Sequence, residues 1–242
     1  ETKEVVVSLI EMLSQQSYVA VDIETDSLDF WKANILCVSF CWGPGQAAVV
    51  PLYIHANAPF WGGEESLKEV YMLLLEFFKT PVAKGLHNGK FDLLCLKFFA
   101  EKLGLPFAFA RFVFDTMYAH YLNNENARGQ HGLEVLAYEH TDFGGYDKVL
   151  DVKRLEIMKE RKVKKREFSY DMFPTEMLYK YACHDVDTVH RATPPLKQAL
   201  QEQGCNWVNS SLCLPLGITL AGVEYQGIKL DREYAEDIKS RY

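Results

Sequence analysis

Two carboxylates in the segment VDIETDSLD have the spacing that chemistry on a metal ion needs. Asp22 and Glu24 stand two residues apart at the end of an apolar run. On a strand this spacing makes both side chains project from the same face. Burying two anionic groups a few ångströms apart is costly unless a counter-ion compensates their charge. We therefore expect a divalent cation beside this pair.

Two further acidic residues complete the candidate site. Asp92 follows Asn88 by four residues in HNGKFD, and Asp185 follows Tyr181 by four in YACHDVD, so each pair occupies one helical face. Carboxylates without His or Cys at ligand spacing favour Mg²⁺ or Mn²⁺ over zinc. Two such ions about 4 Å apart can activate a water and stabilise the leaving oxygen of a phosphoryl displacement. The four carboxylates therefore predict phosphodiester hydrolysis.

The elements predicted around these residues form an α/β sheet. Strands are expected at residues 18–24, which are apolar on both faces, at 34–42 and 46–52, which form a hairpin around GPG, and at 82–86 and 111–116. Helices are expected at residues 64–79, 89–104, 116–122 and 175–203. The last helix should be interrupted or bent near Pro194 and Pro195. Asp115 is expected to be a helix N-cap. Asp22 and Glu24 then lie at the carboxyl end of the central strand, where open α/β sheets bind ligands.

Residues 128–168 combine a short helical pattern with a charged run. Eight basic side chains between residues 153 and 166 have the opposite sign from the chain as a whole, whose net charge is -7. One interpretation is a solvated helix face interleaved with glutamates. The other is an arm that contacts phosphates of a nucleic acid strand. Beyond Gly204, helices are expected at residues 208–226 and 232–241.

Composition limits the class of protein. The 242 residues are 48% hydrophobic, enough for a large core. The acidic net charge argues against bulk attraction to duplex DNA. No apolar run reaches the roughly 20 residues of a membrane helix, and no secretory pattern is present. The six cysteines form no C-x-x-C pair, so we expect buried free thiols. The expected location is intracellular: cytoplasm, nucleoid or an organelle.

Taken in this order, VDIETDSLD, HNGKFD and YACHDVD resemble the three exonuclease motifs of the DnaQ-like 3'–5' exonuclease superfamily. The proofreading domain of family A (polymerase I-like) DNA polymerases matches most closely. The resemblance covers residues 18–191 and implies an α/β, ribonuclease H-like fold. In that fold a mixed five-stranded sheet is flanked by helices, here with a C-terminal helical tail.

The resemblance also implies roles for single residues. Two divalent ions, Mg²⁺ or Mn²⁺, would be bound by the catalytic carboxylates Asp22, Glu24, Asp92 and Asp185. Tyr181 would orient the attacking water or help to deprotonate it. Lys180 stands where another branch of the superfamily has histidine, so the tyrosine (DEDDy) branch is favoured. Thr25 and Leu28 match positions that hold the terminal nucleotide and wedge against its base, and Asn88 matches a residue near the substrate strand.

The C-terminal segment LPLGITLAGVEYQGIKLDREY resembles the entry into the polymerase domain of family A enzymes. The match rests on Glu224, Gly227, Ile228, Leu230 and Asp231. We therefore expect residues 1–204 to be an exonuclease domain. Residues 205–242 would be the helical start of a truncated polymerase domain, without synthesis activity.

The resemblance implies an enzyme that hydrolyses 3'-terminal phosphodiester bonds of DNA and releases monophosphates during proofreading. Its partners would be a single-stranded 3' end of DNA and the polymerase domain of a parent chain, with no membrane partner, and it would be a monomer. One alternative is a stand-alone RNA-trimming exonuclease of the ribonuclease D or RecQ-helicase-associated type, which shares the tyrosine branch. The other is a catalytically inactive nucleic-acid-binding scaffold. A scaffold would tolerate broken motifs, whereas all five catalytic positions are filled here.

Overall fold

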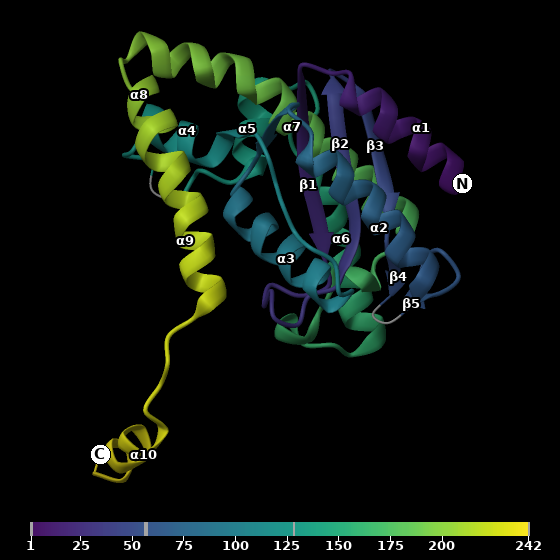
Figure 1. Cartoon of the computed structure of the whole chain (residues 1–242), viewed down its shortest axis with the longest axis vertical. Helices are drawn as coiled ribbons and strands as arrows, with labels where there is room; N and C mark the ends of the chain where they lie inside the picture. Colours follow the sequence, from purple (N-terminus) through teal and green to yellow (C-terminus); the bar gives the residue numbers. More distant parts are fainter. Residues whose placement is uncertain (1, 56–57, 128, 242) are drawn as a thin grey trace.

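A mixed five-stranded sheet lies at the centre of the molecule (Figure 1). The computed structural model describes residues 2–55, 58–127 and 129–241. In spatial order the strands are β3 (Gln46–Pro51), β2 (Ile35–Gly43), β1 (Tyr18–Thr25), β6 (Ala83–Leu86) and β7 (Phe112–Asp115). The first three pair antiparallel, whereas β6 and β7 continue the sheet in parallel. The predicted hairpin and the mixed five-stranded sheet are confirmed. A separate ladder of β4 (Tyr53–His55) and β5 (Ala58–Pro59) was not predicted.

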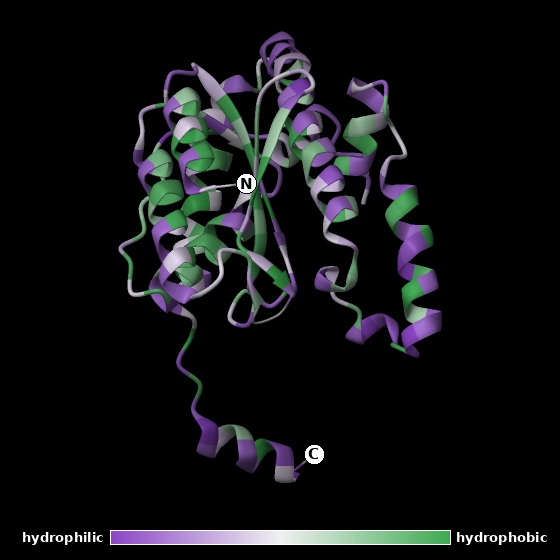
Figure 2. Ribbon diagram, turned by 90° about the vertical axis from the view of Figure 1, so that its right-hand side faces the viewer, coloured by the Kyte–Doolittle hydropathy of each residue, from purple (hydrophilic) through white to green (hydrophobic). Residues whose placement is uncertain are grey.

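Helices cover both faces of the sheet (Figure 2). One layer contains α1 (Lys3–Ser14), α2 (Glu64–Lys79) and α3 (Gly89–Lys102). α1 is not among the predicted helices, because the β-branched residues 5–7 have low helix propensity. Val6, Ile10 and Leu13 nevertheless fall on one helical face and are buried, so packing outweighs propensity.

The opposite layer is built around the long helix α7 (Thr175–Glu202), which packs across β1, β2, β3 and β6. The shorter helices α4 (Thr116–Asn123) and α5 (Leu133–His140) pack against it. Pro194 and Pro195 lie inside α7 without interrupting it. Of the predicted alternatives, the interruption is therefore wrong, and the bend stays a prediction. Neighbouring Ala192 and Leu196 are buried in a hydrophobic cluster with α4 and α5, which offsets the hydrogen bonds that proline cannot donate.

The charged segment forms α6 (Asp147–Arg161), followed by the short 3₁₀ turns η1 (Lys165–Glu167) and η2 (Tyr170–Met172). The basic run therefore lies only partly on a helix, because Lys162 adopts a left-handed φ of 54° that ends α6. The C-terminal segment comprises α8 (Asn206–Val208), the π-helical turn η3 (Asn209–Cys213), α9 (Leu214–Gln226) and α10 (Arg232–Arg241). α9 packs on α3, whereas α10 buries no residue and extends away from the other elements (Figure 1).

All six cysteines are free thiols, as predicted. Cys37, Cys41 and Cys95 are buried. The expectation of burial is wrong for three cysteines, which are partly exposed: Cys183 on α7, Cys205 between α7 and α8, and Cys213 at the end of η3. Within the described part of the chain, no helix combines the length and the apolar character needed to span a membrane.

Candidate active site

The strand β1 directs Asp22 and Glu24 toward the helix α7. Val19 and Val21 pack into the core formed with α1 and α2. The alternate position, Ala20, packs against α7. Because side chains alternate along a strand, Asp22 and Glu24 continue the face of Ala20. A register shift in the β1–β2 pairing lies between Glu24 and Thr25, at the end of the strand.

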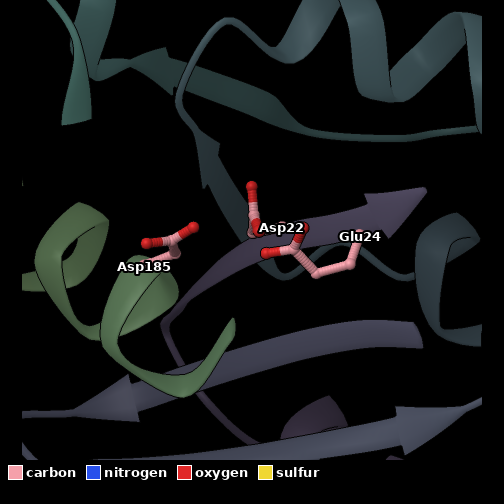
Figure 3. Close-up of side chains that lie close together, drawn as sticks. All are labelled: Asp22, Glu24 and Asp185. Carbon is pink, nitrogen blue, oxygen red and sulfur yellow. The ribbon is translucent and has the colours of Figure 1, made fainter. Parts of the chain in front are cut away.

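Asp185, on the middle of α7, completes a compact cluster with this pair. One carboxylate oxygen from each of Asp22, Glu24 and Asp185 lies within 4.8 Å of the others. Figure 3 shows the two β1 side chains and the α7 side chain facing one another. Asp92, in the first turn of α3, is buried but does not belong to this closest group. Its charge still acts on Glu24, so the four predicted carboxylates share one region.

Burial raises the pKa of all four carboxyl groups. The pKa of Asp22 rises to about 7. For Glu24, burial and then the charges of Asp185, Asp22 and Asp92 raise the pKa well above its usual value. Burial and the charge of Asp22 do the same for the pKa of Asp92 and of Asp185. The protein alone therefore holds protons in this cluster near neutral pH, and bound cations would displace them.

Two tyrosines reach Asp185. Tyr181 lies one helical turn before it on α7, as predicted, and Tyr146 donates a hydrogen bond to Asp185 Oδ1. Both hydroxyls lower the pKa of Asp185, against the larger effect of burial. The ring of Tyr146 also lies 5.5 Å from that of Tyr181. Burial, Asp185 and Glu24 raise the pKa of Tyr181, so its hydroxyl is a hydrogen-bond donor in the protein alone.

Tyr146 is a residue of the site that its sequence context does not predict. This residue stands 39 positions before Asp185, so no fixed spacing connects the two. It also lies in residues 128–168, where the sequence combines a short helical pattern with a charged run. The only available signal was its place directly before the amphipathic start of α6.

Asp115 ties the second motif to the sheet. Its side chain caps α4 as predicted, accepting from the amides of Met117 and Tyr118. It also accepts from the amides of Asn88 and Gly89, at 3.1 and 2.9 Å. These bonds hold the start of α3, the helix that carries Asp92. Asn88 has a φ of 54° and precedes α3. The expectation that it shares a helical face is therefore wrong, because the chain turns into α3 only after it.

The predicted nucleotide-contacting residues lie beside the carboxylates along the chain. Thr25 ends β1, and its hydroxyl donates to the carbonyl of Ser27 at 2.9 Å. Leu28 is 90% exposed at the tip of the following loop.

The carboxylate cluster has the composition of a site for hard divalent cations. Its donors are all oxygens, which suits Mg²⁺ or Mn²⁺. None of the ion pairs found among residues 2–55, 58–127 and 129–241 includes Asp22, Glu24, Asp92 or Asp185. Their charge is thus uncompensated by protein cations, and the donor set fits divalent metal.

Comparison with known sequences gives consistent matches. A family model described as 3'-5' exonuclease, of the DNA polymerase A type, matches residues 1–203. The DNA polymerase of Escherichia phage T5 is 42% identical over 108 residues, covering 43% of this chain and 12% of that protein. The DNA polymerase of Bacillus phage SP01 is 28% identical over 201 residues, covering 82% of this chain and 20% of that protein. The chain thus spans at most a fifth of the length of these two relatives.

Comparison with solved structures gives the same fold. The POL domain of Pol1 from M. smegmatis, in complex with primer-template and dNTP, superposes with a TM-score of 0.66 at 18% identity, covering 98% of this chain and 33% of that one. Brucella melitensis NrnC superposes with a TM-score of 0.59 at 22% identity, covering 88% of both chains. At these identities the similarity shows the ribonuclease H-like fold alone.

Proposed function

This chain belongs to the 3'-5' exonuclease family of the DNA polymerase A type, and on that premise we propose that it removes nucleotides from single-stranded 3' ends of DNA with two divalent cations. The observation that carries the proposal is the cluster of Asp22, Glu24 and Asp185 within 4.8 Å, with Asp92 beside it. A structure of the similar protein NrnC is described with bound Mg²⁺. That description supports Mg²⁺ or Mn²⁺ here.

The chain's own residues have distinct tasks in this proposal. Bound cations would supply an activated water and charge stabilisation for the leaving oxygen. Asp22, Glu24, Asp92 and Asp185 hold the cations. Tyr181, whose hydroxyl is a donor beside Asp185, orients the attacking water. Water oxygen bonds to the phosphorus of the last phosphodiester as the bond to the 3' oxygen of the penultimate nucleotide breaks. The products are a nucleoside 5'-monophosphate and a strand with a new 3'-hydroxyl.

Substrate contacts are assigned in the same proposal. Thr25 and Leu28 hold the terminal nucleotide, and Asn88 lies near the strand. Exposed basic side chains that form no ion pair in the described part of the chain give the strand a phosphate path: Lys159, Arg161, Lys162, Lys164 and Lys165. The segment that follows them is tied to the loop after β1, since Ser169 Oγ donates to the carbonyl of Asp26 at 2.7 Å.

The proposed biological setting is proofreading within a DNA polymerase. Two observations support it: the relatives are DNA polymerases, and the family match ends at residue 203. Residues 1–204 would then form the exonuclease domain, and residues 205–242 the start of the polymerase domain.

The test is a nuclease assay on a 5'-labelled single-stranded oligonucleotide. Asp22→Ala combined with Glu24→Ala should abolish Mg²⁺-dependent shortening while leaving the circular dichroism spectrum unchanged, because it removes ligands rather than core. The matched control is Glu64→Ala with Glu65→Ala, two exposed carboxylates on α2. Metal-dependent shortening that survives in the first double variant would refute the assignment.

The same assay separates DNA from RNA. NrnC, which matches over nearly its full length, is described in complex with pGG. That description favours a short substrate of the pGG kind as the second candidate. A higher kcat/KM on single-stranded RNA or on a dinucleotide than on DNA would select that candidate.

A further inference from the structure

The helix α9, in the C-terminal segment, contacts the loop that follows Asp22 and Glu24 on β1. This loop, residues 26–34, joins β1 to β2 and carries Leu28. The ring of Tyr225, near the end of α9, lies 5.0 Å from the ring of Trp31 and stacks on Phe30 at 6.0 Å. We call Phe30, Trp31 and Tyr225 the aromatic clasp. It joins a helix outside the family match to the loop beside the carboxylates.

Two charged side chains on α3 also contact Tyr225. Lys97 Nζ lies 3.8 Å from the centre of the Tyr225 ring, and the Tyr225 hydroxyl donates to the carboxylate of Glu101. The adjacent Glu224 forms a 2.5 Å ion pair with Lys90, in the first turn of α3. The end of α9 is therefore attached along the helix that carries the second acidic motif.

Hydrogen bonds secure the two ends of the loop, local hydrogen bonds around Asp29 order its middle, and the clasp joins that middle to α9. Asp26 Oδ1 accepts from the amide of Asn34 at 2.7 Å, closing the base of the loop. Lys102 Nζ donates to Asn34 Oδ1 at 2.8 Å, and Ser169 donates to the carbonyl of Asp26. Near the tip, Trp31 also meets Phe98 of α3 edge-on at 5.6 Å. Three aromatic contacts from outside the loop therefore hold Phe30 and Trp31, and two of them come from Tyr225 of α9.

We propose that Tyr225 is a positioning residue for the exonuclease: through the aromatic clasp, α9 holds the loop so that Thr25 and Leu28 meet the 3'-terminal nucleotide. This inference rests on the proposed function. It gives α9 a task in the exonuclease, in addition to any task in a following domain. Aromatic pairs and cation–π contacts of this kind resist displacement of the loop, so losing them lets Leu28 move away from the nucleotide.

The first test compares steady-state kinetics on a labelled single-stranded DNA with Mg²⁺. Tyr225→Ala should raise KM about tenfold and change kcat less than about twofold, because the carboxylates stay in place. Tyr225→Phe keeps the ring and should restore KM to within about twofold of the wild type. The control is Tyr234→Ala, an exposed tyrosine on α10, which should leave both constants unchanged.

The second test needs no activity. Lys32 lies in the loop with its side chain 78% exposed, so limited trypsin digestion reports how far the loop opens. Tyr225→Ala should speed cleavage after Lys32 about tenfold, whereas the Tyr225→Phe and Tyr234→Ala variants should not. An unchanged KM or an unchanged cleavage rate in Tyr225→Ala overturns the inference. If the wild type degrades no nucleic acid, the proposed function fails and the positioning role with it, while the digestion still decides whether the clasp holds the loop.

Discussion

Replacing Asp22 by Asn should stabilise the metal-free protein at alkaline pH while it destroys activity. Burial raises the pKa of Asp22 from 3.8 to about 7. The folded state therefore favours the protonated acid. The free energy of unfolding of the wild type is highest below the unfolded pKa of 3.8, falls as pH rises from there, and levels off above about 7. Three pKa units correspond to about 4 kcal/mol as an upper bound. Solvent access and relaxation of the cluster reduce this, so we expect a gain of about 2 kcal/mol at about pH 8.

The assay is thermal unfolding in EDTA at about pH 5 and about pH 8, and the quantity compared is the difference in Tm between Asp22→Asn and wild type. A gain of about 2 kcal/mol corresponds to a Tm rise of about 4–8 °C for a domain of this size. At pH 5 the difference should be about a third to a half of that at pH 8, because the folded acid is protonated there while the unfolded carboxyl, with a pKa of 3.8, is already ionised. Glu160→Gln, an exposed carboxylate on α6, should show no difference at either pH. Adding ~10 mM Mg²⁺ should raise the Tm of the wild type more than that of Asp22→Asn, because the variant lacks a ligand. A variant that is no more stable than wild type at pH 8 would show that the carboxylates do not strain the metal-free fold.

Three other perturbations follow from particular contacts. Tyr146→Phe removes a donor to Asp185, so the Mg²⁺ concentration for half-maximal activity should rise about tenfold; an unchanged requirement contradicts the positioning of Asp185 by Tyr146. Asp115→Ala leaves four backbone amides without an acceptor, so denaturant titration should show a loss of about 3 kcal/mol, and a loss below about 1 kcal/mol is the contrary result. Neutralising four basic residues together should reduce the slope of log affinity for single-stranded DNA against log salt by up to about 3: Lys159, Lys162, Lys164 and Lys165. The control Lys68→Gln on α2 should leave this slope unchanged.

Residues close together in the sequence were predicted well. Asp22 and Glu24 share a face of β1, as the two-residue spacing required. Tyr181 and Asp185 share a face of α7, as the four-residue spacing required. The five strands of the sheet were also predicted, because their apolar runs are short and bounded by turns. Whether the predicted ligands and substrate contacts act as assigned stays a prediction, and the variants above decide it.

Contacts between distant segments were not predictable in the same way. Tyr146 reaches Asp185 only because α6 packs beside α7. α7 continues through Pro194 and Pro195 because its neighbours bury it, against the local preference of proline. Asp115 was predicted as a cap, but its second task at the start of α3 depends on β6 and β7 lying in parallel.

The sequence by itself determined which side chains share a face, since strand and helix periodicity follow from covalent geometry. That was enough to bring the acidic motifs to one expected site. Only the tertiary structure decided which partners meet them: Tyr146 at Asp185, Asp115 at the start of α3, and Tyr225 on the loop after β1. These contacts join elements that lie far apart along the chain. The packing of whole helices and strands sets the distances between them, and the number of intervening residues does not.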